Sequence, residues 1–442
     1  MLANRGKWTR QKAMIMVLTL WIVVVLGVLA TSLAFDVQVN SKLALMQREK
    51  FQAYNLARSA VALGMVNLQN DMLIDYQENP NQPVDSFADV WAMRDRREKD
   101  VEVEMGKGTY EVQIVDEEGK ININRASASL IKTILEYYDY EAPDSETIAN
   151  AIVDWRDADD MALGTNPGKE NEVYSAMGGQ KISSKTLPEE LAVQCPNEDY
   201  LTIEELLDVF DNLGVDREIY YGYDPDAEEA RELKMRNDVA MGHTTRDKSK
   251  RKVRGKKEQL ALKDILTVQG SGRININTAS EEVLTILFAA ATGGSNFETA
   301  AATARSICDY RGDRKTGHAP DPEDAFKSAA DLAKVSGVDQ KLVGSLGNSG
   351  ALGVQIGFSS NVFTVTGIGR VGSQKQTVSV LVNRFLETFN PDDAQLTSNK
   401  GSLRGRASRG NMRSRISRTG GANGATDNLI RNPSIRVLQW ME

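Results

Sequence analysis

The sequence is poor in the residues that build most metal and redox centres. Its 442 residues include two cysteines, Cys195 and Cys308, and two histidines, His243 and His318. That scarcity excludes a Cys/His zinc site and a disulfide framework, although the two cysteines could still pair in an oxidising compartment. It also argues against a histidine-based catalytic centre. With a net charge of −8, the chain as a whole is not built to bind nucleic acid or anionic lipid.

Acidic residues are absent from the first 35 positions, and residues 13–35 carry no charge at all. About 20 apolar residues cross a bilayer as a helix, whereas the apolar region of a cleaved secretory signal has about 7–15, so this segment is predicted to stay as an anchor. The positive-inside rule then predicts a cytoplasmic N-terminus and a body outside the cytoplasm. The basic residues that precede the segment are Arg5, Lys7, Arg10 and Lys12.

The apolar segment continues as an amphipathic helix. Hydrophobic residues recur at helical spacing from Val39 to Leu68, with no glycine between Phe35 and Gly64 and no proline before Pro80. A helix from residue 14 to about residue 75 would be roughly 90 Å long, half of it in the membrane and half above it. A plain membrane anchor explains the apolar segment alone. The full length resembles the spine of a type IV pilin-like subunit.

An internal repeat divides the body into two related halves. Residues 120–127 and 273–280 both contain the string N-I-N-x-A-S, and both precede a segment with apolar residues three and four positions apart. The alternating Ile-Asn pairs predict a short strand or extended entry, and Ser127 and Ser280 are predicted helix caps. In the second copy, Glu281 and Glu282 suit the first turn of a helix.

The same motif opens helix-hairpin-helix modules, so DNA binding is an alternative function. Such modules bring a glycine-rich hairpin and basic side chains to the phosphates. The first copy has no glycine in the expected turn, residues 139–143, whereas the second has Gly293 and Gly294. Residues 116–224 hold 25 acids against 8 bases, a net charge of −17 that would repel DNA. Structural packing of the hairpins is therefore the preferred interpretation.

A string of acids follows the first repeat, in residues 151–160 (AIVDWRDADD) and 168–174 (GKENEVY). Alternating acids followed by a glutamate about ten residues later can supply the six to eight oxygen ligands that calcium takes. The glycine and the twelfth-position glutamate of an EF-hand are missing from their places. A solvated acidic loop is the competing interpretation, and a hydrolase that uses these carboxylates is a third, weaker alternative.

Taken together, these motifs resemble the K family of type II secretion minor pseudopilins (GspK) over residues 11–390, in the same order. The resemblance includes residues 200–209 (YLTIEELLDV) and the closing segments 361–370 and 377–384. Most pilin-like subunits carry Glu at the fifth mature position, where this chain has Leu18, a feature the K type shares. By this resemblance the chain is not an enzyme. It implies calcium held by Asp154, Asp157, Asp159, Glu170 and Glu172.

The implied fold class is α+β, with a long transmembrane helix, a small pilin-like antiparallel sheet and a large inserted α-helical domain in two helix-hairpin-like halves. Alternating residues place the strands at 101–104, 110–115, 354–368 and 377–385. The expected segments are a leader (1–13), a transmembrane and spine helix (14–78), the first strands of the sheet (79–120), a first α-domain (121–224), a charged linker (225–272), a second α-domain (273–350), the last strands of the sheet (351–389) and a disordered basic tail (390–442).

The resemblance also implies how the chain is processed, where it is located and which partners it binds. Prepilin peptidase would cut between Ala13 and Met14, with Gly6 as the alternative site, and the mature chain would sit in the inner membrane with its bulk in the periplasm. Its expected partners are the I and J minor pseudopilins, the major pseudopilin, the inner-membrane secretion platform and secreted substrates, without nucleic acid. The seven bases in residues 248–257 depart from the family pattern and are interpreted as a solvated linker.

Overall fold

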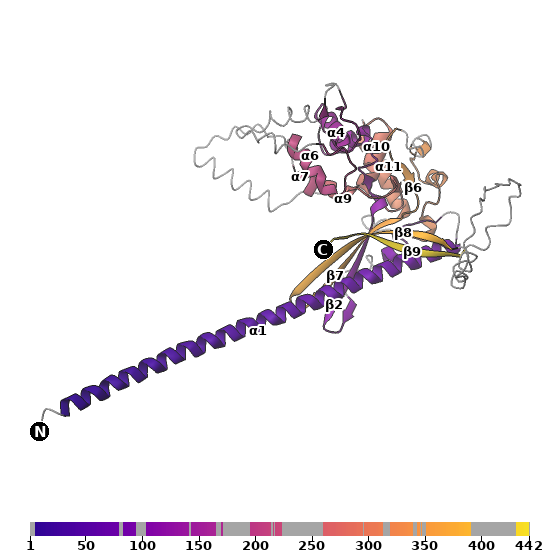
Figure 1. Cartoon of the computed structure of the whole chain (residues 1–442). Helices are drawn as coiled ribbons and strands as arrows, with labels where there is room; N and C mark the ends of the chain where they lie inside the picture. Colours follow the sequence, from indigo (N-terminus) through magenta and orange to yellow (C-terminus); the bar gives the residue numbers. More distant parts are fainter. Residues whose placement is uncertain are drawn as a thin grey trace, which may run out of the picture.

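The computed structural model of the chain describes residues 5–78, 83–93, 103–140, 143–164, 169–170, 195–213, 215, 217–222, 260–294, 296–312, 319–338, 343–344, 346, 351–389 and 430–441. A long helix runs from the N-terminal end to a small sheet, and a helical region lies beyond that sheet (Figure 1). The predicted fold class, α+β with a long apolar helix, an antiparallel sheet and two helical hairpins, is confirmed.

The long helix is α1 (Arg5–Glu78), 74 residues without a break. It ends two residues before Pro80, which cannot continue a helix, as predicted. Its first half projects away from the rest of the molecule (Figure 1). The large apolar side chains there are exposed, with Leu18 at 61% and Trp21 at 66%. Among the described residues this is the one helix long and apolar enough to span a membrane.

The sheet has five antiparallel strands in the order β1-β2-β7-β8-β9. They are β1 (Val103–Met105), β2 (Gly108–Asp116), β7 (Val362–Val371), β8 (Gln374–Phe389) and β9 (Ile430–Met441). The central pair, β2 and β7, is separated by the whole helical region in sequence. The helical region is therefore an insertion between two neighbouring strands of one sheet.

The second half of α1 packs across the sheet. Small residues at helical spacing, among them Ala57 and Ala60, lie fully buried against the valines of β7 and β8. The helix backbone comes unusually close to β7 because β7 carries Gly367 and Gly369 there. A Cβ atom at either glycine would collide with a carbonyl oxygen of α1, at Ala57 or Ala53. Short α2 (Val90–Met93) adds Trp91, whose ring meets Phe363 edge-on at 5.2 Å.

The helical region consists of two hairpins over one continuous core. The first hairpin is α3 (Ala128–Tyr137) with α4 (Asp144–Asp154), and the second is α10 (Glu281–Ala291) with α11 (Phe297–Arg311). The remaining short elements are η2 (Glu117–Gly119), η4 (Ile203–Glu205), α6 (Leu206–Leu213), α7 (Glu218–Tyr221), α9 (Leu262–Ile265), η5 (Pro322–Asp324) and η6 (Ala329–Lys334).

The first asparagine of each N-I-N string is the last residue of a short strand in a small parallel pair. β3 (Ile121–Asn122) pairs with β4 (Leu266–Thr267), and β5 (Arg273–Asn275) pairs with β6 (Gln355–Gly357). The predicted caps are also present. Ser127 Oγ accepts from Leu130 N at 3.3 Å, and Ser280 Oγ accepts from Val283 N at 3.2 Å.

Two segment predictions are corrected by the structure. The linker was expected to reach residue 272, but residues 260–272 fold into α9 and β4 because Leu262, Ile265 and Leu266 are buried in the helical core. The tail was expected to be disordered to residue 442, but residues 430–441 form β9. Its alternating Ile435 and Val437 pack against the sheet core. This strand was not predicted because the preceding residues are rich in Arg and Ser.

Candidate metal centre and domain junction

Three of the five predicted metal ligands lie together at the end of α4. Asp154 is the last residue of that helix, and Asp157 lies in the turn after it. Glu170 comes later in the sequence and lies next to both of them. One carboxylate oxygen from each lies within 4.8 Å of the others. We call these three residues the cation group. Because Ca–O distances are about 2.3–2.6 Å, two oxygens bound to the same ion can be this far apart.

The acidic loop that joins these residues brings Glu170 back to α4. Met161 and Lys169 form an antiparallel bridge, and Glu170 N donates to Asp160 O at 3.4 Å. Leu163 N donates to Asp154 Oδ2 at 2.9 Å, which ties the loop to the helix end. The cation group therefore lies at the base of a closed loop rather than on an open surface.

The cation group is buried and rich in negative charge. Asp154 and Glu170 are fully buried, and neither oxygen of Glu170 accepts a hydrogen bond from an N–H or hydroxyl group of the described residues. Burial, together with the charges of Asp154 and Asp157, raises the pKa of Glu170 to about 7. The pKa of Asp157 is raised by burial and by neighbouring acids. A bound divalent cation would supply the missing positive charge, so these residues fit such an ion.

The other two predicted ligands are not part of this group. Asp159 turns its carboxylate to the backbone, where Oδ1 accepts from Met161 N at 2.9 Å. Glu172 lies outside the described residues. Half-buried Cys195 lies beside the cation group, and burial, with the nearby Glu170 and Asp154 carboxylates, raises the pKa of its thiol to about 12. Neither described cysteine forms a disulfide.

Two arginines that the sequence analysis missed hold the repeated motifs in shape. The Arg156 guanidinium donates to the carbonyl oxygens of Ile123 and Ala126. Arg311 does the same in the second half, to Ile276 and Ala279. The signal was available, since both follow an aspartate and an aromatic residue, as D-W-R and D-Y-R, near the end of the second helix of each hairpin. The duplication therefore includes the arginine as well as the N-I-N string.

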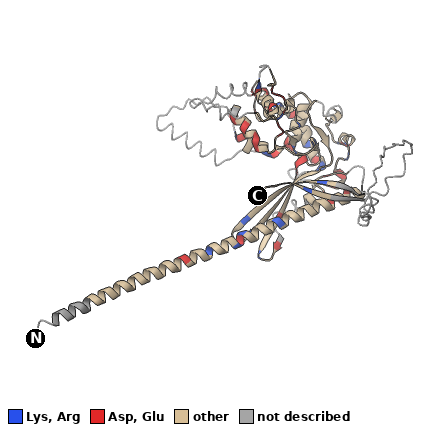
Figure 2. Cartoon of the chain, in the orientation of Figure 1, with Lys and Arg blue, Asp and Glu red and all other residues tan. Residues whose placement is uncertain are grey.

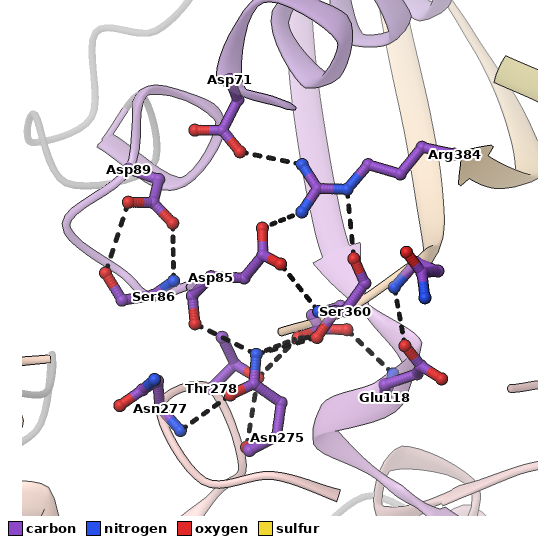
Figure 3. A network of polar contacts seen from close by, with 12 residues as sticks. Asp71, Asp85, Ser86, Asp89, Glu118, Asn275, Asn277, Thr278, Ser360 and Arg384 are labelled. Carbon is purple, nitrogen blue, oxygen red and sulfur yellow. Dashed lines mark hydrogen bonds and ion pairs between the residues drawn. The ribbon is translucent and has the colours of Figure 1, made fainter. Parts of the chain in front are cut away.

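A buried polar network joins the helical domain to the sheet (Figure 3). We call it the junction, and its members are Asp71, Asp85, Asp116, Asn275, Thr278, Ser360 and Arg384. The Arg384 guanidinium, on β8, bonds to Asp71 of α1 at 2.9 Å, to Asp85, and to Ser360 O at 3.1 Å. One buried cation thus connects the long helix, the sheet and the segment that follows α1.

The helical domain enters the junction through its second N-I-N motif. Asn275 Nδ2 donates to Asp85 O at 3.0 Å and to Ser360 Oγ at 2.8 Å. Asp116 Oδ2 accepts from Thr278 Oγ1 and Ser360 Oγ, both at 2.6 Å. These contacts position the helical domain on the sheet. A second acidic group, Asp71 with Asp75 and Asp85, lies here, but Arg384 already pairs with two of its members.

The hairpin turns do not favour DNA contact. Gly293 and Asp139 each lie two residues after the first helix of their hairpin, and both have a left-handed backbone conformation, with φ of 89° and 64°. A Cβ atom at Gly294 would lie 3.4 Å from Glu136 Oε2, so a carboxylate stands beside the glycine turn. In the second hairpin Arg305 is paired with Glu281 at 2.9 Å, and Arg311 is turned to carbonyl groups. Phosphates would meet acids here.

No protein-family model matches this chain, and no curated protein matches it either. Among solved structures, the chain is similar to one described as the crystal structure of the GspK-GspI-GspJ complex from the enterotoxigenic Escherichia coli Type 2 Secretion System. The likeness covers 77% of this chain and 94% of that chain, at 16% sequence identity and a TM-score of 0.46. A match of this degree does not by itself assign a family or a function.

Proposed function

We propose that this chain is a K-type minor pseudopilin of a type II secretion system, an assembly component rather than an enzyme. The observation that carries the proposal is α1. One unbroken helix exposes its apolar half and packs its other half on an antiparallel sheet, with a helical domain inserted between two strands of that sheet. The sequence resemblance over residues 11–390 supports the same assignment.

The proposed location is the inner membrane, with the helical domain in the periplasm. The four bases before residue 13 hold the N-terminus in the cytoplasm, since positive charge is retained on that side. The apolar residues of α1 then cross the bilayer and contact the equivalent helices of other pseudopilins. In this orientation the helical domain stands farthest from the membrane (Figure 1).

The proposed position is the tip of the pseudopilus. Leu18 cannot form the ion pair through which an acid at that position binds the N-terminal amine of a neighbouring subunit. The helical domain also extends beyond the sheet at the end away from the membrane, where it would collide with a subunit stacked above it (Figure 1). A tip subunit has no such neighbour. The chain would cap or initiate the pseudopilus together with the I and J minor pseudopilins.

The cation group is proposed to bind calcium. Its three carboxylates are hard oxygen ligands, as calcium prefers, and backbone carbonyls and water can complete the shell of about six to eight oxygens. Bound calcium would neutralise the buried carboxylates and clamp the acidic loop against α4. Its role would be structural, because the group lies at the base of a loop.

The mature N-terminus tests the proposal. Mass spectrometry of protein extracted from membranes should find a chain that begins at Met14, because prepilin peptidase cuts at the cytoplasmic edge of the apolar segment. A chain that begins at Lys7 would show processing after Gly6 instead. A chain that keeps its first thirteen residues would contradict the pseudopilin assignment and leave a plain membrane anchor.

A further inference from the structure

The helical domain exposes three large apolar side chains on the acidic loop and on the segment that bonds to it. Met161 is 56% exposed, Leu163 is 44% exposed and Leu201 is 73% exposed. We call these three side chains the docking face. α4, whose end begins the acidic loop, lies at the end of the molecule opposite the N-terminal end of α1 (Figure 1). In an anchored chain, this end is the part most accessible to other proteins.

Two of these side chains belong to residues whose backbone is tied to the cation group or to its immediate neighbour. Leu163 is tied through its backbone N–H to Asp154, at 2.9 Å. Met161 forms the bridge with Lys169, directly before Glu170. Both apolar residues therefore lie within the loop that the cation group closes. An ion that draws Asp154 and Glu170 together would hold Met161 and Leu163 in place.

Leu201 belongs to the same region because its segment lies against the acidic loop. Asn197 Nδ2 donates to Asp159 O at 2.6 Å, which joins the two segments four residues before Leu201. Asn124 fixes the end of this segment, since its side chain bonds to both Tyr200 O and Tyr200 N at 2.9 Å. The docking face is thus built from two segments that are anchored to each other and to the first N-I-N motif.

The surroundings of the docking face are acidic. Exposed carboxylates lie on both segments: Asp159, Asp160, Glu198 and Asp199. Of the described bases in these segments, Lys169 is paired with Asp160 at 3.7 Å and Arg156 is turned to carbonyl groups. Acidic residues are also frequent on the neighbouring helices α6 and α7 (Figure 2). A partner that covers the face must therefore bring positive charge as well as apolar side chains.

We propose that the docking face binds a cationic amphipathic segment of another protein, and that the ion at the cation group holds the face in its binding form. The inference rests on the proposed cation site and names the chemistry of the partner. Apolar residues of the segment would cover Met161, Leu163 and Leu201, while its lysines or arginines would meet the surrounding carboxylates. Acidic segments would be repelled, which makes the face selective.

A segment of the chain itself could compete for the docking face, namely the basic run at residues 248–257. It belongs to the segment between Gly222 and Ala261, two residues that meet in the structure, since a Cβ atom at Gly222 would lie 3.1 Å from Ala261 Cβ. We favour an external partner because the run has almost no apolar residues with which to cover the docking face. Replacement of its bases separates the two possibilities.

The probe is a fluorescein-labelled amphipathic peptide of leucine and lysine, titrated by anisotropy with the full chain in detergent. With calcium present it should bind, and Met161→Ser combined with Leu163→Ser should weaken binding about tenfold. EDTA should weaken it to a similar degree. A leucine–glutamate peptide and a serine–lysine peptide should bind much less. The control Met105→Ser, which removes an apolar side chain 53% exposed on β1, should change nothing.

Three results would overturn the inference. The first is peptide binding by the Met161/Leu163 variant that equals binding by the unmodified chain. The second is equal peptide binding with and without EDTA, by a chain that calorimetry shows to bind calcium. The third is peptide binding that appears only when the bases of residues 248–257 are replaced by serine. Calcium calorimetry on the unmodified chain is read separately. If the chain binds no calcium, the proposed cation site fails, whereas calcium binding without peptide binding removes the docking face alone.

Discussion

Asp154 has two tasks in the acidic loop. Its Oδ2 accepts a hydrogen bond from Leu163 N, and its carboxylate is one of three that face each other in a buried site. The first task requires an oxygen, while the second requires a negative charge. An asparagine would keep the first and lose the second, so the two tasks can be separated by one substitution.

Asp154→Asn should therefore remove the response to calcium without unfolding the chain. If calcium binds the folded chain alone, a concentration 100 times the dissociation constant stabilises the fold by about 2.7 kcal/mol. Thermal unfolding followed by tryptophan fluorescence should show this increase in the unmodified chain and little of it in the variant. Asp159→Asn is the matched control and should respond like the unmodified chain. A calcium response retained by Asp154→Asn would exclude this residue as a ligand.

Buried acids in and beside the junction make stability depend on pH, among them Asp116, a member of the junction, and Asp89, which accepts from Ser86 N beside it. Burial raises the pKa of Asp116 to about 7, and burial with the charge of Asp71 raises that of Asp89 from 3.8 to about 8. An acid with a higher pKa in the folded state binds its proton more tightly there. Its contribution to stability is complete below about pH 4 and is lost as the pH rises through the folded-state value.

The free energy of unfolding from this source should consequently fall between about pH 4 and pH 8. Asp89→Asn keeps a side chain that can accept from Ser86 N and removes the titration, so its urea unfolding should lose part of this decline. Asp309→Asn, on the exposed face of α11, is the control and should follow the unmodified chain. If Asp89→Asn shows the same pH dependence as that control, Asp89 does not titrate in this range.

At the scale of elements, β9 protects the edge of the sheet. It covers the edge of β8 over 11 paired positions. Phe389 pairs with Ile430, so the 40 residues between them connect the two strands of a hairpin. Arg58 of α1 lies over the Trp440 ring, 5.5 Å from its centre, and ties the end of β9 to the helix. An uncovered β8 would be a long edge open to other chains.

Removal of residues 430–442 should cause self-association. The unpaired N–H and C=O groups of β8 would then pair with a second chain. Light scattering after size exclusion should show oligomers that the full chain does not form. Deletion of residues 400–420 is the control, because it shortens the connection and leaves β9 in place. A monomeric product after removal of β9 would show that the edge of β8 needs no cover.

At the scale of the whole molecule, the apolar half of α1 is separate from the folded body. Among the described residues, none before Ala53 is buried in a hydrophobic core. The candidate membrane span therefore adds no core contact to the folded body. The body is held by the second half of α1, the sheet, the junction and the helical core.

A chain that begins at Val37 should fold without detergent and unfold at the temperature of the full chain. The removed residues make no core contact, so the expected change in stability is within about 0.5 kcal/mol. Circular dichroism melts of both proteins, the full chain in detergent, provide the comparison. As a control, a chain that begins at Leu68 should lose its sheet packing, because Ala53, Ala57 and Ala60 would be missing. A large loss of stability in the chain that begins at Val37 would contradict this separation.

Local sequence was sufficient to predict the elements that depend on neighbouring residues. The uncharged segment and the absence of proline before Pro80 defined α1, and Ser127 and Ser280 marked the starts of two helices. Three of the five predicted ligands came together because Asp154, Asp157 and Glu170 lie within 17 residues of one another. In each case the deciding interaction is local, so its signal is present in a short stretch of sequence.

The junction, the arginine contacts and β9 depend instead on the tertiary structure. Arg384 and Asp71 are 313 residues apart, and Asn275 and Asp85 are 190 apart, so no local pattern links them. β9 could not be predicted from its own sequence, because its few apolar residues form a strand only by pairing with the edge of β8. A buried charge or an edge strand is stable only when a distant partner supplies the opposite charge or the free backbone groups, and that partner is defined by the fold.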